Sequence, residues 1–232
     1  MSVNNMRKNK WIYALFFLGL IILVYPHIAQ VVNKHIQKSQ VNHFIKEAKS
    51  MPSIEITNYY DQVRKCNEAI FKNEEGFHDP FTEYYKQNAY PECQDISFDG
   101  GQFAAIEIPK LDLHIPIYLG ATENELSRGI GQVEGSSLPV GGISTHTVLA
   151  GHRGMGTKAM FRNLDLLKIG DVFHIHTLEG ILTYEVYDVE VILPHETDNL
   201  RIVEGKDLAS LITCHPYRAN SHRLVVHGER LN

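Results

Sequence analysis

The sequence predicts a mainly β fold, a closed or nearly closed barrel of short strands, preceded by an N-terminal membrane helix. Two observations lead to this prediction. Residues 11–25 carry no charge and follow a basic cluster. From residue 103 onward, short runs of β-branched and aromatic residues are separated by Gly, Pro and Asn. Regularly spaced short strands without long helices between them are typical of barrels rather than of doubly wound sheets.

The composition is that of an ordinary globular protein. The chain has 232 residues, of which 44% are hydrophobic and 21% charged, enough for one sizeable core plus extensions. The formal net charge is -5 and the basic residues form no long run, so the composition does not support nucleic-acid binding. We therefore expect one catalytic domain and no nucleic-acid partner.

The N-terminus is predicted to be a membrane anchor. Residues 11–32 are mostly apolar and reach the roughly 20 residues that a helix needs to span a bilayer. No clear small-x-small cleavage site follows them, which favours an uncleaved anchor over a signal peptide. The basic residues within 1–10 keep that end in the cytoplasm. We expect a single-pass protein of the cell membrane whose residues 33–232 lie outside the cell.

Residues 33–101 are predicted to form juxtamembrane helices and then a long loop. Apolar residues recur at helical spacing within 33–50 and, less cleanly, within 55–72. From residue 73 to 101 the sequence is polar and aromatic, with several Gly and Pro and no sustained period. A loop of this length is usually functional or disordered.

The barrel is predicted to occupy residues 102–232, with at least seven strands. The predicted strands are 103–108, 115–118, 145–150, 172–177, 182–192, 209–213 and 223–226. One segment departs from the pattern, because residues 158–167 place apolar side chains at helical spacing. We expect this segment to be a short helix packed on the barrel.

Cys214 is the candidate nucleophile. It ends an apolar strand that Pro216 stops, and a strand end holds a side chain rigidly while leaving it open to a substrate. Arg223 opens the next strand after a short connection, so both side chains can reach the same rim. A cation there favours the reactive thiolate, and its donors can hold the oxyanion that forms when the thiolate attacks a carbonyl.

His152 is the candidate acid and base. A cysteine nucleophile needs a group that protonates the leaving amine, and histidine is the usual one. His152 follows the predicted strand 145–150 and stands between Gly151 and Arg153-Gly154, where glycines allow close approach of a ligand. A metal site built from Cys214 and the other histidines near it is disfavoured, since no ligand pair has a known spacing.

The remaining cysteines leave two possibilities open. Three cysteines in an exported chain mean that at least one is unpaired. Cys66 and Cys93 lie in the same extension, where they can form a disulfide or stay free. Cys214 is then the cysteine left over.

Taken together, these residues resemble the sortases of Gram-positive bacteria, over roughly residues 73–230. The segment 210–214, Ser-Leu-Ile-Thr-Cys, is similar to the family's TLxTC signature, with Ser for the first Thr. Residues 150–153, Ala-Gly-His-Arg, look like its catalytic histidine loop. Residues 213–224 fit the pattern TCxPYxxNxxRL of the class C, pilin-polymerising sortases. The resemblance implies the eight-stranded sortase β-barrel.

The same class carries an N-terminal lid with an Asp-Pro-aromatic triplet, and the long loop contains Asp79-Pro80-Phe81. The resemblance implies that Asp79 pairs with Arg223 while Phe81 covers the sulfur of Cys214, until a pilin displaces the lid. A plain Asp-Pro turn is the alternative. Many pilin sortases also have a C-terminal membrane segment, which residues 229–232 do not resemble. Either the N-terminal anchor suffices or the subclass differs.

The function implied by the resemblance is cysteine transpeptidation. Cys214 attacks the Thr-Gly bond of an LPXTG-like sorting signal, Arg223 stabilises the oxyanion and His152 protonates the leaving amine. A pilin lysine then accepts the acyl group. The alternatives are a housekeeping sortase that attaches surface proteins to peptidoglycan and a membrane-tethered scaffold that binds pilins without joining them. The expected partners are pilins or surface proteins with such a signal; no cofactor is expected.

Overall fold

The structure is a computed structural model that describes residues 3–73, 79–81, 93, 96 and 101–231. Within these residues eight strands close into a barrel in the order β1-β2-β3-β4-β7-β8-β6-β5. The strands are β1 (Gln102–Ile108), β2 (Leu113–Leu119), β3 (Ile130–Gln132), β4 (Thr145–Ala150), β5 (Val172–His176), β6 (Ile181–Ile192), β7 (Asp207–His215) and β8 (His222–Arg230). The predicted barrel is therefore confirmed.

Two of the strand pairings are parallel. β2 pairs in parallel with β3, and β4 pairs in parallel with β7, while the other neighbours are antiparallel. Every predicted strand has its counterpart. β3 was missed, because three residues are too few to form a recognisable β-branched run.

The inside of the barrel is packed with large apolar side chains. Fully buried members of this core include Ile106, Ile115, Leu149, Phe173 and Tyr184. Burying each such side chain contributes about 1.5–3 kcal/mol. The barrel is thus a filled core and not a channel, so substrates must bind on its outside or at its rims.

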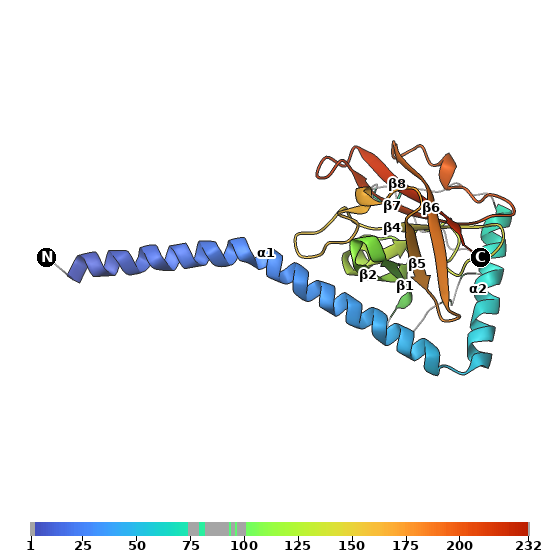
Figure 1. Ribbon diagram of the computed structural model, residues 1–232, viewed down its shortest axis with the longest axis horizontal. Helices are drawn as coiled ribbons and strands as arrows, with labels where there is room; N and C mark the ends of the chain where they lie inside the picture. The colour runs from blue at the N-terminus through green and yellow to red at the C-terminus, as the bar shows by residue number, and fades with distance from the viewer. Residues whose placement is uncertain (1–2, 74–78, 82–92, 94–95, 97–100, 232) are drawn as a thin grey trace.

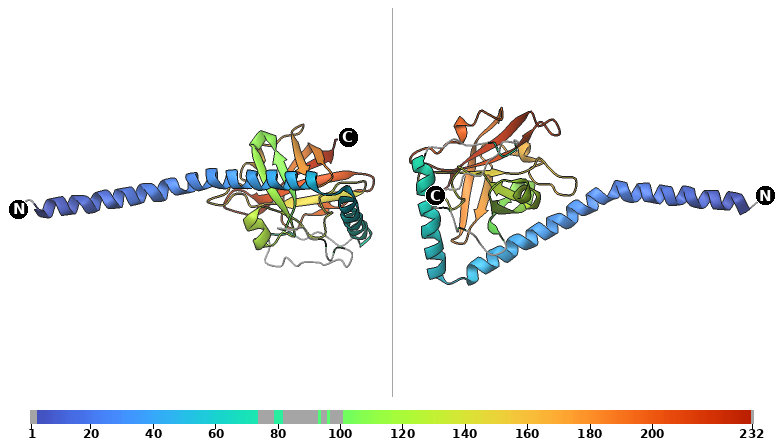
Figure 2. Two further views of the ribbon diagram at one scale, coloured as in Figure 1. Left: turned by 90° about the horizontal axis from the view of Figure 1, so that it is seen from below. Right: turned by 180° about the vertical axis from the view of Figure 1, so that it is seen from behind.

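Two α-helices precede the barrel in the described part of the chain. α1 (Val3–Ser50) is one helix from the predicted anchor to the end of the first juxtamembrane segment, and α2 (Ser53–Asn73) comes after a short turn. The two lie as a V that embraces the barrel (Figure 1), and the views of Figure 2 show the first half of α1 standing clear of it. α1 bends before it reaches the barrel, and Pro26 within it, which removes one backbone hydrogen bond, accounts for the bend.

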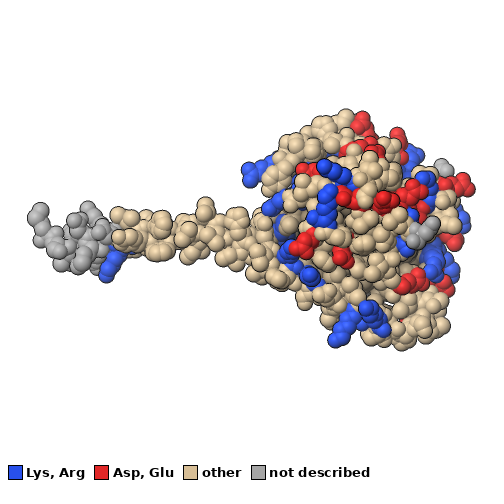
Figure 3. All heavy atoms as spheres, viewed as in Figure 1, with Lys and Arg blue, Asp and Glu red and all other residues tan. Residues whose placement is uncertain are grey.

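Among the described residues, one helix is long and apolar enough to cross a membrane, and it lies at the N-terminus. Its side chains from Trp11 to Val32 are mostly exposed. Figure 3 shows this rod without charged side chains beyond its very start, whereas acidic and basic side chains are interspersed over the globular part. Farther along α1, Val41, Phe44 and Ala48 are buried against the rest of the protein.

The helix predicted for residues 158–167 is wrong. The segment consists of turns and the short 3-10 helix η3 (Leu164–Leu166). Met160 has φ of 45°, outside the right-handed helical region, so an α-helix cannot continue through it. The apolar positions were nevertheless correctly identified as packed, since Met160, Phe161 and Leu164 are fully buried.

Cys66 of α2 and Cys93 form a disulfide, which decides between the two possibilities left open by the sequence. Cys66 belongs to the main apolar core. The bond therefore ties Cys93 to the core, and it leaves Cys214 as the free cysteine.

Candidate active site

Cys214 and Arg223 face each other across two neighbouring strands. β7 and β8 are antiparallel, and their register pairs Cys214 directly with Arg223. The connection between the strands is short enough to hold both residues at one end of the barrel, as the sequence predicts. Both are largely buried, with 7% of Cys214 and 4% of Arg223 exposed.

His152 reaches the same end through the parallel pairing of β4 with β7. Ala150 pairs with Ile212, and one residue farther on, the backbone N–H of Gly151 donates to the Ile212 carbonyl at 3.1 Å. The hydroxyl of Thr213 donates to the Gly151 carbonyl at 2.7 Å. Gly151 and Thr213 are thus hydrogen-bonded to each other, and His152 and Cys214 are the residues that directly follow them. Strand pairing brings all three candidate catalytic residues together.

Asp79 holds the guanidinium of Arg223. Nε of Arg223 donates to the two carboxylate oxygens at 2.9 and 3.1 Å, and Nη2 donates to one of them at 2.6 Å. Nη1 donates to the carbonyls of Asn220 and His222, each at 2.9 Å. Every nitrogen of the fork is thus engaged, and both side chains of the ion pair are buried.

Phe81 lies over the same residues. Its ring centre is 5.3 Å from the guanidinium carbon of Arg223 and 6.3 Å from the ring centre of His152. At the first distance the positive charge is attracted to the face of the ring. Asp79 and Phe81 therefore occupy the space in front of Arg223 and His152. That Phe81 covers the sulfur of Cys214 stays a prediction.

The environment of Cys214 keeps its thiol protonated in this arrangement. Burial raises the pKa of the Cys214 thiol. The positive charge of Arg223 lowers that pKa, but the negative charge of Asp79 raises it again. The negative charge of Asp79 therefore offsets part of the effect by which Arg223 would favour the thiolate of Cys214.

Arg153 is a residue of this site that the sequence reasoning missed. It is buried, and Nη1 donates to the carbonyl of Cys214 at 3.3 Å and to Nδ1 of His215 at 2.9 Å. Nη2 lies 3.1 Å from Asp165. Arg153 thus ties the histidine loop to the end of β7. Its place directly after His152 was a signal, but nothing in the sequence shows which way the side chain points.

Glu123 of α3 (Glu123–Arg128) is a second residue that was missed. One of its carboxylate oxygens lies 3.5 Å from Nε2 of His152, although the Glu123 side chain is mostly exposed. The contact joins residues far apart in the sequence, so no local pattern could have indicated it.

Polar side chains from four neighbouring strands, β4, β7, β8 and β6, contact one another in a row. Nε2 of His146 lies 2.7 Å from the Ser210 hydroxyl, which lies 2.8 Å from Nδ1 of His227. Nε2 of His227 lies 2.9 Å from Glu190. Nδ1 of His146 contacts the Arg201 carbonyl at 2.9 Å. Burial lowers the pKa of His146 to about 4, so the ring is neutral near pH 7.

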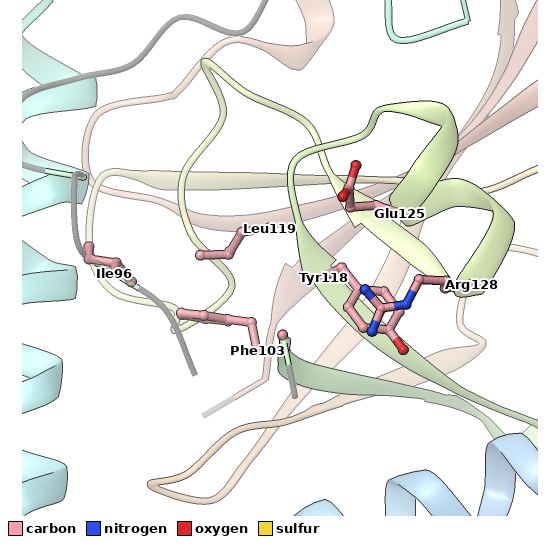
Figure 4. A pocket seen from close by; sticks show the side chains of 7 residues that line it. Ile96, Phe103, Tyr118, Leu119, Glu125 and Arg128 are labelled. Atoms are coloured by element: carbon pink, nitrogen blue, oxygen red, sulfur yellow. The ribbon is translucent and has the colours of Figure 1, made fainter. Parts of the chain in front are cut away.

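No group of three His, Cys, Asp or Glu side chains able to hold a metal ion occurs in the described part of the chain. A separate hollow of about 220 Å³ lies beside α3 (Figure 4). The Arg128 guanidinium lies there over the ring of Tyr118, 4.2 Å from its centre. Cys214, His152 and Arg223 are not among its described lining residues.

The sortase domain model matches residues 106–231, more than half of the chain. The chain belongs to the sortase family. Sortases are cysteine transpeptidases, and solved structures of this family are similar to this sortase over most of its length. Sortase C of Streptococcus pneumoniae is 36% identical with a TM-score of 0.77, over 84% of this chain and 97% of that one.

Two further relatives extend the comparison. Sortase C1 of GBS pilus island 1 is 36% identical with a TM-score of 0.76, over 84% of this sortase and 92% of that chain. Sortase A of Streptococcus agalactiae is 23% identical over 235 residues, which is 97% of this sortase and 89% of the relative. The structural neighbours are thus class C sortases, the class whose cysteine motif and lid triplet this sequence resembles.

Proposed function

We propose that this sortase polymerises pilins, with Cys214 as nucleophile, His152 as acid and base, Arg223 as oxyanion donor and Asp79-Pro80-Phe81 as a lid. The observation that carries the proposal is the buried ion pair between Asp79 and Arg223. It puts a carboxylate where a substrate carbonyl would bind. A housekeeping sortase, the alternative, would be favoured by a lid that is absent or disordered. The similarity to sortases of pilus systems supports the same choice.

The lid has to leave before the reaction begins. All three nitrogens of Arg223 are already bonded in this arrangement, two of them to Asp79. An incoming sorting signal would replace Asp79 with its own carbonyl. Departure of Asp79 also removes the charge that raises the pKa of Cys214. Opening the lid therefore frees the oxyanion donor and favours the thiolate in one step.

The first half-reaction forms an acyl-enzyme. The thiolate of Cys214 attacks the carbonyl carbon of the Thr-Gly bond in an LPXTG-like signal, and the negative charge on the carbonyl oxygen is stabilised by Arg223. The carbon–nitrogen bond breaks as His152 gives its proton to the leaving glycine amine. The product is a thioester on Cys214 and a neutral His152.

The second half-reaction reverses these roles. The amine of a pilin lysine attacks the thioester carbon, His152 takes a proton from that amine, and the thiolate of Cys214 leaves. An isopeptide bond has formed, and the enzyme has returned to its starting protonation state. None of these steps calls for a metal or an organic cofactor.

The catalytic residues would lie outside the cell, close to the membrane surface. Residues 1–10 would lie in the cytoplasm, residues 11–32 would span the bilayer once, and residues 33–101 would lead as helices and lid to the barrel of residues 102–232. The basic residues before the apolar stretch support this orientation. The acceptor and donor proteins would meet the enzyme while still close to the membrane.

Mass spectrometry of the full-length protein with an LPXTG-type peptide and a pilin tests the proposal. We expect a Cys214-dependent thioester and covalent pilin ladders, both lost in Cys214→Ala. A thioester that yields peptide products but never ladders would favour the wall-anchoring alternative. Pilin binding without any thioester would favour the non-enzymatic scaffold and overturn the proposal.

A further inference from the structure

The loop that carries His152 has little regular structure of its own. Between β4 and η3 the chain runs through bends and turns, and no helix or strand occurs in residues 151–163. Gly154 adopts φ of 121°, which only glycine takes readily. The conformation of this loop is therefore set by what it packs against.

One face of α1 contacts the outer part of this loop. The side-chain amide of Gln30 donates to the carbonyl of Gly156 at 3.0 Å, and that of Asn33 donates to the carbonyl of Thr157 at 2.9 Å. The two donors stand three residues apart, which places them on the same side of the helix. Figure 1 shows the loop, in yellow, reaching from the barrel toward α1.

The same face of α1 reaches the inner part of the loop through Gln37. The Gln37 side chain is buried, and its amide nitrogen lies 3.8 Å from the sulfur of Met160. The next residue, Phe161, donates its backbone N–H to the carbonyl of His152 at 3.0 Å. The path from the helix to the His152 backbone thus has two contacts and one peptide bond.

The loop is also held by contacts with the barrel and with α3. Phe161 is fully buried against Gly151, where an added Cβ would lie 2.8 Å from its ring. Lys158 donates to the carbonyl of Ser127 at the end of α3 at 2.7 Å. The loop is therefore held between the barrel, α3 and α1, and α1 is the support that also belongs to the predicted anchor.

We propose that Gln30, Asn33 and Gln37 are positioning residues for His152. By this inference α1 does more than attach the enzyme to the membrane, because it completes the support of the loop that presents the acid and base. The inference rests on the proposed role of His152. Proton transfer depends steeply on geometry, so a loosened loop slows the chemical steps while substrate binding to Cys214 and Arg223 is kept.

The test compares full-length variants in lipid nanodiscs, all carrying Asp79→Ala so that lid opening does not limit the rate. One variant combines Gln30→Ala, Asn33→Ala and Gln37→Leu, the last of which keeps the buried volume. The control is Lys34→Ala, which removes the ion pair of the same helix with Asp112 but no loop contact. The measurements are kcat and KM for an LPXTG-type peptide, melting temperature, and amide exchange at residues 154–158.

We expect the triple variant to lose roughly tenfold in kcat with KM unchanged. Its melting temperature should equal that of the control, and its amides at residues 154–158 should exchange faster. A kcat equal to that of the Lys34→Ala control, or a loss that tracks the melting temperature, would overturn the inference. If the parent itself forms no thioester, the proposed function fails and this inference with it. If the parent is active and the triple variant matches it, the inference alone fails.

Discussion

Asp79 binds the guanidinium of Arg223 through three hydrogen bonds, with nitrogen-to-oxygen distances of 2.6 to 3.1 Å. The pair is buried, so each charge depends on the other for its stabilisation. Because Arg223 is paired with Cys214 across β7 and β8, a change in the ion pair also changes the pKa of the Cys214 thiol.

Replacing Asp79 with Asn should make Cys214 more reactive. Asp79 raises the pKa of the thiol, so its neutral isostere lowers that pKa and increases the thiolate fraction near pH 7. We expect alkylation by iodoacetamide to accelerate roughly three- to tenfold, measured by mass spectrometry over time. Asp112→Asn, which removes a surface carboxylate paired with Lys34, is the matched control. Equal rates in both variants would contradict the expectation.

Replacing Arg223 with Lys separates charge from geometry. Lysine keeps a positive charge but lacks the planar fork that bonds Asp79 and two carbonyls. We expect kcat for peptide cleavage to fall about 10²–10³-fold, while Cys214 still alkylates. A lysine variant with parental kcat would show that a charge alone suffices at this position.

Gly151 should be intolerant of a side chain. A Cβ there would lie 2.6 Å from Ile130 and 2.8 Å from Phe161, whereas at Gly156, farther along the same loop, it would meet nothing within 4 Å. We expect Gly151→Ala to cost about 1–3 kcal/mol of unfolding free energy and to displace His152. Gly156→Ala should remain close to the parent. Urea denaturation and peptide cleavage together check both expectations, and equal behaviour of the two variants would refute them.

His146 should make the protein less stable in acid. Burial lowers its pKa to about 4 from an ordinary 6.5. Between these two pH values, His146 is therefore mostly protonated in the unfolded chain and mostly neutral in the folded protein. Stability from this residue is complete above pH 6.5 and declines by about 3 kcal/mol as the pH falls to 4.

Urea denaturation at several pH values isolates this contribution. We expect the difference in unfolding free energy between the parent and His146→Gln to shrink by that amount between pH 6.5 and 4. All other titratable groups are common to the two proteins, so their contribution to the difference cancels to first order. Parallel stability curves would show that His146 is not the acid-sensitive group.

The disulfide between Cys66 and Cys93 should stabilise the fold measurably. It closes a loop with a sequence separation of 27 residues, and a cross-link of that span contributes about 3.5 kcal/mol by restricting the unfolded chain. We expect Cys66→Ser/Cys93→Ser to lower the melting temperature, and a reductant to lower that of the parent but not of the variant. A reductant effect that persists in the variant would point elsewhere.

The sequence was most informative where neighbours in space are also neighbours in the chain. Cys214 and Arg223 are joined by a short connection between antiparallel strands, so their opposition could be predicted. The alternation of short strands likewise predicted the barrel. The predicted helix at residues 158–167 was wrong because Met160 has a positive φ, and apolar spacing indicates burial but not backbone dihedral angles.

Contacts between distant segments could not be obtained in this way. The approach of Asp79 to Arg223 was expected only through a family resemblance, since a lone Asp-Pro pair is commonly a simple turn. The contacts of Glu123 with His152 and of Gln37 with Met160 bring together residues from separate elements. The partner of Cys66 was undecided for the same reason, because cysteine spacing alone does not fix pairing.

α1 runs as one helix from Val3 to Ser50, so the stretch that would cross the bilayer and the stretch that packs on the barrel form a single strut. The part from Asn33 to Ser50 extends about 27 Å at helical rise. A thicker or thinner bilayer would tilt the membrane-spanning part of α1. That tilt would also change the height and angle of the barrel above the lipid headgroups. Hydrophobic mismatch would then act mechanically on the enzyme, and the bend at Pro26 is where α1 could absorb it.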